Sequence, residues 1–112
     1  FLYNFYVYNN SKFYNSQERD FLSNLDEKTA ILFWSVGCPH CHYVLTTLKE
    51  RPELERKLNI IKLEVSQNQT NAELFYSVVK YCNLRYYGVP LLFHNNKCIL
   101  GRDQVIEYLE SL

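Results

Sequence analysis

Residues 29–35, TAILFWS, form a continuous apolar run that follows a charged stretch. A strand that faces water on one side alternates apolar with polar residues, whereas an unbroken apolar run of this length predicts a strand buried on both faces. Such a strand needs helices packed above and below its sheet. We therefore expect an α/β fold built around this segment.

Strands and helices alternate along the rest of the chain. Strands are predicted by apolar and aromatic segments at residues 3–8, 29–35, 59–65, 91–93 and 97–100. Apolar residues at helical spacing predict four helices, which begin after Asn15, at Pro39, near Thr70 and before Val105. The order β-α-β-α-β-α-β-β-α favours a central mixed sheet flanked by helices, since alternating elements pair in parallel and a closing hairpin is antiparallel. Because 112 residues suffice for one core only, we expect a single domain over residues 1–112.

Capping signatures mark the starts of two helices. Asn15 stands three residues before Glu18. Thr70 stands three residues before Glu73 in the same way, so both pairs predict a capping box. Pro52 is expected to end the second helix, because proline cannot continue one. The apolar face of the first helix is predicted to contain Phe21, Leu22 and Leu25.

The charge balance argues against nucleic acids and membranes as partners. Lys plus Arg number 12, as do Asp plus Glu, and the basic residues are scattered rather than clustered, so we expect no binding to nucleic acid. No apolar run approaches the roughly 20 residues of a membrane-spanning helix. We therefore expect no membrane insertion of this domain.

The stretch 37–42, GCPHCH, is compatible with three chemistries. C-x-x-C is the spacing of a redox dithiol, C-x-x-C-H attaches c-type haem, and two thiols beside imidazoles are half of a zinc site. Of the four cysteines, Cys38 and Cys41 form the one close pair, while Cys82 and Cys98 stand alone. One functional pair fits this distribution best. Whether the other two cysteines pair stays open, because a disulfide needs Cα atoms within about 7 Å.

The position of the close pair favours dithiol–disulfide exchange. Cys38 lies where the buried strand ends and a helix begins, so its sulfur is expected at the positive end of the helix dipole, which stabilises a thiolate. Cys41 follows one turn later and is more enclosed. We therefore expect an exposed nucleophilic thiol at Cys38 and a resolving thiol at Cys41. His40 is expected to lower the pKa of the Cys38 thiol further, and Pro39 suits the first helical turn.

Three alternatives fit less well. Haem attachment would use His42 as an axial ligand in a largely helical pocket, and a strand directly before C-x-x-C-H is poor context for it. A structural zinc site needs four ligands, and the remaining candidates, Cys82, His94 and Cys98, do not form a second close pair. Cysteines that only fill the core would not need a Pro-His dipeptide between them at a strand–helix junction. We expect no cofactor and no metal.

The chain resembles the thioredoxin superfamily over nearly its whole length. The resemblance is carried by FWSVG before CPHC, the segment 62–68, the Gly88-Val89-Pro90 turn with its hairpin, and Gly101 before the last helix. It implies a thioredoxin-like fold in which Pro90 is cis and its loop faces the dithiol. It also implies that the backbone of Val89 pairs with an extended substrate chain in a mixed disulfide. Tyr86 and Tyr87, beside this loop, are candidate substrate contacts.

Three features differ from thioredoxin itself. Leu32 replaces the buried acid that thioredoxin carries six residues before the first cysteine, and Gly37 replaces the usual aromatic. The dipeptide inside the motif is Pro-His, which resembles the DsbA-type oxidants, and Val89 before the cis-proline is also common in that group. A proton relay between Lys62 and Glu64 is conceivable, but solvated strand charges are the favoured interpretation.

We expect a thiol–disulfide oxidoreductase that acts on protein cysteines, with Cys38 as nucleophile and Cys41 as resolving thiol. Its expected partners are protein thiol or disulfide substrates and a redox partner protein, and we expect a monomer. The alternative is a non-catalytic thioredoxin-like module that binds a partner through the cis-proline loop. The chain has no Met and begins at Phe1, so we expect that a segment has been removed upstream. On that ground we favour a periplasmic, secreted or membrane-anchored setting over the cytoplasm.

Overall fold

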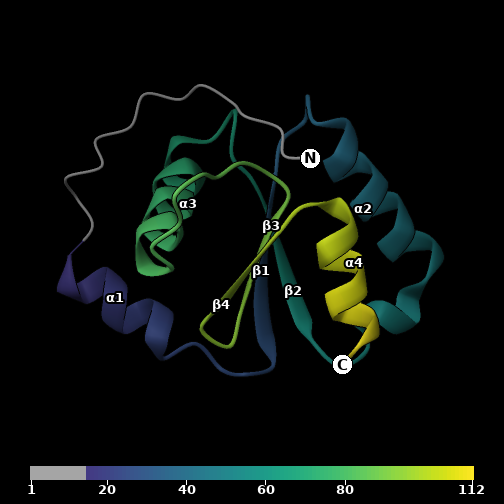
Figure 1. The fold of residues 1–112 in the computed structure, drawn as a ribbon, viewed down its shortest axis with the longest axis horizontal. Coiled ribbons are helices and arrows are strands. Elements are labelled where there is room, and N and C mark those ends of the chain that lie inside the picture. Colours follow the sequence, from purple (N-terminus) through teal and green to yellow (C-terminus); the bar gives the residue numbers. More distant parts are fainter. Residues whose placement is uncertain (1–14) are drawn as a thin grey trace.

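The computed structural model describes residues 15–112, so the strand expected at residues 3–8 lies outside the described part. Within it, helices and strands alternate as the sequence predicts (Figure 1). The elements are α1 (Ser16–Ser23), β1 (Thr29–Trp34), α2 (Pro39–Glu50), the 3-10 helix η2 (Pro52–Glu55), β2 (Asn59–Glu64), α3 (Gln69–Tyr81), β3 (Leu91–His94), β4 (Lys97–Leu100) and α4 (Arg102–Glu110). None of the helices in this range is long and apolar enough to cross a membrane.

The described strands form one mixed sheet in the order β2-β1-β3-β4. β1 pairs with β2 in parallel, so that Leu32 lies beside Lys62. β1 pairs with β3 in the antiparallel direction, so that Leu32 lies opposite Leu92. β3 and β4 form the closing antiparallel hairpin. The expected central mixed sheet is therefore confirmed, and β1 has a partner on each side.

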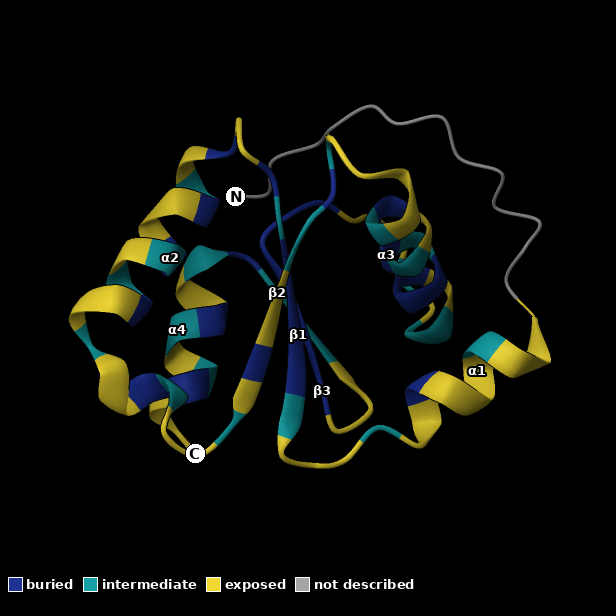
Figure 2. Ribbon diagram, turned by 180° about the vertical axis from the view of Figure 1, so that it is seen from behind, coloured by how far each residue is buried: buried dark blue, intermediate teal, exposed yellow. Residues whose placement is uncertain are grey.

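β1 is buried on both faces, as its apolar run predicts. Ala30 and Leu32 pack in a core with residues of α2 and α4. Ile31 and Phe33 pack in a second core with residues of α1 and α3. The two helix pairs lie on opposite sides of the sheet, and their buried surfaces face it (Figure 2). The strand that leads toward Cys38 is thus held between two cores.

The two predicted capping boxes have different outcomes. At α1 the expected box is formed. At α3 the box predicted from Thr70 and Glu73 is wrong, because the cap is Asn68, whose Oδ1 accepts a hydrogen bond from the backbone N–H of Asn71 at 2.9 Å. Asparagine caps a helix at least as well as threonine, and Asn68 comes earlier along the chain in extended backbone. α3 therefore begins before Thr70.

The apolar face predicted for α1 is only partly right. Leu22 is buried and Leu25 packs half-buried against the same core, but the side chain of Phe21 is 53% exposed. The reason is the position of α1, a short helix that lies against α3 at the margin of the fold. Such a helix buries a narrow stripe, and Phe21 falls outside it.

A helix end and a hairpin turn lie where the sequence predicts them. α2 ends at Glu50, and Pro52 starts η2. The turn between β3 and β4 consists of Asn95 and Asn96, with φ of 50° and 64°. Left-handed backbone at both central residues is the geometry of a tight hairpin turn, and asparagine tolerates it better than most residues. The hairpin predicted at this point is therefore confirmed.

A disulfide joins Cys82 to Cys98, the pairing that the sequence left open. Their Cα atoms lie 6.3 Å apart, within the usual range. Cys82 caps α3 and Cys98 lies in β4, so the bond ties a helix of one layer to the last strand of the sheet. The loop that it closes, residues 83–97, contains Val89 and Pro90.

Replacing both Cys82 and Cys98 with Ala is expected to lower the free energy of unfolding by about 3 kcal/mol, because the disulfide removes roughly that much loop entropy from the unfolded chain. Urea unfolding under non-reducing conditions measures the loss, with the Cys38–Cys41 pair oxidised in both proteins. Each single variant should lose a similar amount. An unchanged urea midpoint in the double variant would show that the bond stabilises nothing.

Candidate active site

Cys38 is the N-cap residue of α2 and lies between that helix and β1. Its backbone is extended, with φ −97° and ψ 108°, and its Sγ accepts a hydrogen bond from the backbone N–H of Cys41 at 3.1 Å. Pro39 takes the first helical position, where its missing N–H is not needed. The sulfur therefore lies at the positive end of the helix dipole beside a donor, which stabilises a thiolate when the pair is reduced.

Cys41 lies one turn further along α2 and forms a disulfide with Cys38, with Cα atoms 5.2 Å apart. Both residues are fully buried, so the exposed thiol expected at Cys38 is wrong for the disulfide form. In that form the sulfur is bonded to the buried Cys41, and the carbonyl oxygen of the buried Val89 lies 3.7 Å from it. The neighbours Gly37 and Pro39 remain exposed, and His40 is half-buried between the two cysteines.

The loop before β3 faces the disulfide. The Val89–Pro90 peptide bond is cis, and the carbonyl oxygen of Val89 lies 3.7 Å from Cys38 Sγ. The backbone N–H of Gly101, at the start of α4, donates to the carbonyl oxygen of Pro90 at 3.0 Å and so holds this loop. The cis-proline and its place opposite the dithiol therefore agree with what the superfamily resemblance implies.

Tyr87 forms an aromatic surface two residues before Val89. The residue is 41% exposed, and its ring packs edge-on against Phe75 and Tyr76 of α3, with ring centroids 6.0 and 5.6 Å away. Burial, and to a smaller extent the neighbouring Tyr87, raises the pKa of the Tyr76 phenol. Tyr86, at 74% exposed, lies mostly in solvent. Of the two tyrosines, Tyr87 is the one whose ring packs against α3.

β1 carries no acid beneath the dithiol. Leu32 is buried there in the core with residues of α2, α4 and β3. Lys62, its neighbour on β2, is exposed and pairs with Glu55 at 2.9 Å. The conceivable relay between Lys62 and Glu64 therefore does not form, and the favoured interpretation of Lys62 as a solvated strand charge holds.

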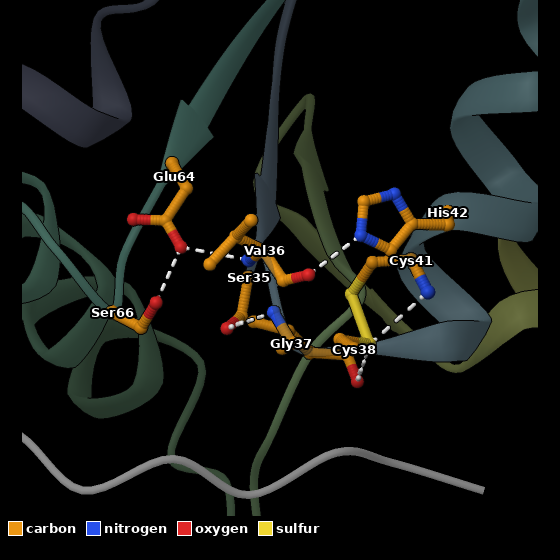
Figure 3. The surroundings of a disulfide bond; sticks show 9 residues. Ser35, Val36, Gly37, Cys38, Cys41, His42, Glu64 and Ser66 are labelled. Atoms are coloured by element: carbon orange, nitrogen blue, oxygen red, sulfur yellow. Dashed lines mark hydrogen bonds between the residues drawn. A yellow bond between two sulfur atoms is a disulfide. The ribbon is translucent and has the colours of Figure 1, made fainter.

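Glu64 has a role that the sequence did not reveal. At the end of β2, its carboxylate accepts hydrogen bonds from the backbone N–H of Val36 at 2.8 Å and from the Ser66 hydroxyl (Figure 3). It also accepts one from the backbone N–H of Gln67 at 2.8 Å. Partial burial acts to raise the pKa of Glu64, but these hydrogen bonds outweigh it and hold the pKa below its ordinary value of 4.5. An ionised carboxylate thus anchors the segment just before Cys38.

His42 holds the same segment from α2. Its Nε2 lies 2.6 Å from the carbonyl oxygen of Val36, so Nε2 carries the hydrogen and donates. The ring packs edge-on against Trp34, with centroids 5.9 Å apart. The sequence suggested His42 only as a haem or zinc ligand. Nothing local indicates the contact with Val36, because it forms only once the chain has turned from strand into helix.

The four cysteines are all used in the two disulfides. Among residues 15–112, no three His, Cys, Asp or Glu side chains gather closely enough to hold a metal ion. His94, a zinc candidate, is buried between the Tyr108 hydroxyl and the carbonyl oxygen of Glu27. It therefore links β3 to α4 and to the loop before β1.

Comparison with known proteins adds a sequence relative and two structural neighbours. No family model matches the chain. A probable glutaredoxin of Acanthamoeba polyphaga mimivirus is 31% identical over 94 residues, which cover 80% of this chain and 85% of that protein. A wheat glutaredoxin structure has a TM-score of 0.55 at 19% identity, over 86% of this chain and 80% of that one. A mutated buckwheat glutaredoxin has a TM-score of 0.58 at 16% identity, over 90% and 83%. The two structures establish the shared thioredoxin-like fold.

Glu64 is predicted to make stability depend on pH. A carboxyl group whose pKa is lower in the folded than in the unfolded chain adds stability above the unfolded value, and this stability is lost as the pH falls through the folded value. Glu64→Gln should therefore be less stable than the wild type at neutral pH, with the difference shrinking below pH 4.5. Urea unfolding of both proteins across the acid range measures this. A pH-independent difference would contradict the prediction.

Proposed function

The chain belongs to the glutaredoxin family, within the thioredoxin superfamily, and on that premise we propose that it exchanges disulfides with protein substrates through Cys38 and Cys41. Family membership and the C-x-x-C pair make it a glutaredoxin-like thiol oxidoreductase. The observation that carries the proposal is the position of Cys38 Sγ, between the N–H of Cys41 and the carbonyl oxygen of Val89. A sulfur in that place has a donor that stabilises its thiolate on one side and the cis-proline loop on the other.

In the reducing direction, the Cys38 thiolate attacks one sulfur of a substrate disulfide, and the substrate S–S bond breaks. A mixed disulfide forms, and the released substrate thiolate takes up a proton. Cys41 then loses its proton and attacks Cys38 Sγ, which forms the Cys38–Cys41 disulfide and releases the second substrate thiolate. Two electrons pass from the protein to the substrate. The same steps run in reverse when the oxidised protein accepts electrons from a substrate dithiol.

The remaining site residues support these steps. Pro39 begins α2 directly after the nucleophile and keeps it at the helix N-terminus. His40, when protonated, adds positive charge beside the sulfur, which lowers the pKa of the Cys38 thiol and favours the reduced form. The backbone of Val89, which is buried together with Pro90 in the disulfide form, pairs with the extended substrate chain in the mixed disulfide, and the more exposed Tyr87 adds an aromatic contact surface.

The pair is more oxidising than that of thioredoxin in this proposal. The helix dipole, the N–H of Cys41 and a protonated His40 all stabilise the reduced thiolate, while Leu32 stands in place of the buried acid. The second disulfide, between Cys82 and Cys98, supports a periplasmic, secreted or membrane-anchored setting, because such bonds persist in oxidising compartments. The protein acts there as a monomer on protein thiols or disulfides, together with a redox partner protein.

Cys38→Ser should abolish disulfide exchange, whereas Cys41→Ser should still attack substrates and remain attached to them as a mixed disulfide. An insulin-reduction assay measures the first effect. Mass spectrometry of Cys41→Ser incubated with oxidised substrate measures the second. A wild type that binds its partner without exchanging disulfides, and whose binding survives Cys38→Ser, would instead identify a non-catalytic binding module.

The reduction potential of the Cys38–Cys41 pair should lie between about −120 mV, the value of DsbA, and about −230 mV, the lower end for glutaredoxins. We expect a potential above that of thioredoxin because the reduced thiolate is stabilised. Equilibration of the Cys82→Ala/Cys98→Ala protein with glutathione buffers isolates this pair and measures its potential. A value near thioredoxin's potential of about −270 mV would contradict the oxidising direction.

A further inference from the structure

Val36, two residues before Cys38, is held on both sides by side chains that the exchange steps do not use (Figure 3). We propose that Glu64 and His42 are positioning residues for thiol–disulfide exchange, which hold the turn at residues 35–38 and so keep Cys38 at the start of α2. The proposal deepens the proposed function and rests on it, because both concern the same dithiol.

The two contacts restrain successive peptide groups. Glu64 accepts a hydrogen bond from the N–H of Val36 at 2.8 Å, and His42 Nε2 donates to the carbonyl oxygen of Val36, 2.6 Å away. The N–H belongs to the peptide group before the Val36 Cα, and the carbonyl belongs to the peptide group after it. Both backbone rotations at Val36 are therefore restricted.

Val36 is held through its backbone rather than its side chain. The residue is 48% exposed, so packing contributes little to its position. Gly37 follows, and glycine has more backbone freedom than any other residue. The turn itself is closed by a hydrogen bond from the N–H of Cys38 to the carbonyl oxygen of Ser35 at 3.0 Å. Glu64 and His42 thus restrain the backbone at a point where the neighbouring residues restrain it little.

The two anchors of the turn, Glu64 and His42, both lie on elements that pack in the core. Glu64 ends β2 beside Trp34 in the parallel register, and hydrogen bonds from Ser66 and Gln67 orient its carboxylate. His42 lies on the first turn of α2, and its ring packs edge-on against Trp34. The turn is therefore held between the end of one strand and the start of one helix, both of which belong to the packed core.

The position of the turn determines the surroundings of the sulfur. Cys38 Sγ receives the N–H of Cys41 while Cys38 keeps its extended backbone at the helix start. A displacement of about 1 Å at a reacting atom can slow a reaction by about a hundredfold. Loss of either anchor should weaken the stabilisation of the thiolate and slow its attack, although neither anchor touches the sulfur.

A purely electrostatic role for Glu64 predicts the opposite sign. A carboxylate near a thiolate raises the pKa of the thiol by repulsion, so its removal would lower that pKa. A positioning role predicts that removal raises the pKa, because the thiolate loses its fixed donor. The pKa of the Cys38 thiol therefore distinguishes the two roles.

The test is a pH titration of Cys38 in the reduced protein, followed by ultraviolet absorbance of the thiolate and by the rate of reaction with a small aromatic disulfide. Glu64→Ala and His42→Phe remove the two anchors, and the phenyl ring preserves the contact with Trp34. Each should raise the pKa of the Cys38 thiol by about half a unit to one unit and slow the reaction about three- to tenfold, the effect of one lost hydrogen bond. Glu64→Gln and His42→Gln keep an acceptor and a donor, so they should recover most of the loss.

Glu55→Ala is the matched control, because it removes a carboxylate that pairs with Lys62 outside the site, and it should titrate like the wild type. Thermal unfolding checks that each variant is folded, and if Glu64→Ala is not, His42→Phe and its Gln counterpart decide the question. A pKa that falls or stays unchanged in the anchor variants would overturn the positioning role. If the wild type exchanged no protein disulfides, the proposed function would fail, and the titration would still decide what the two anchors do.

Discussion

β1 is buried on both of its faces, and the helices and the neighbouring strands pack around it. Alternate residues of this strand enter two separate cores, one with α2 and α4 and the other with α1 and α3. A slip of one residue would exchange the two faces and expose or overfill both cores, so the strand has one stable register. Whatever follows β1 in sequence is therefore placed accurately relative to both helix layers. This arrangement sets the position of Cys38, which follows β1 in the chain.

The dithiol lies where the end of β1, the start of α2 and the cis-proline loop meet. α2 supplies the dipole and the N–H of Cys41, and the loop supplies the carbonyl oxygen of Val89. The loop is itself restrained twice, by the hydrogen bond from Gly101 and by the Cys82–Cys98 disulfide that closes the segment around it. Each group near the sulfur is thus held by an element of the packed core, which is how a small fold keeps a reactive group in one geometry.

Local patterns predicted the elements well and some of their details poorly. The buried strand, the proline at the start of α2 and the Asn-Asn hairpin depend on neighbouring residues, and all three are observed. The start of α3 was misplaced because several polar residues before it are able to cap a helix, and only the backbone conformation at Asn68 selects one. The prediction for Phe21 is wrong because periodicity identifies a helix face without saying how much of that face another element covers.

A layered α/β fold with a dithiol at a strand–helix junction follows from local patterns in the sequence, because periodicity and the residues around CPHC act over a few positions. Three contacts become visible only in the folded chain: Cys82 bonds to Cys98, the carbonyl oxygen of Val89 lies beside the sulfur of Cys38, and Glu64 holds the turn before it. Each of these contacts joins residues far apart in the chain. Their geometry follows from strand register and helix packing, which many residues set together and no short pattern records.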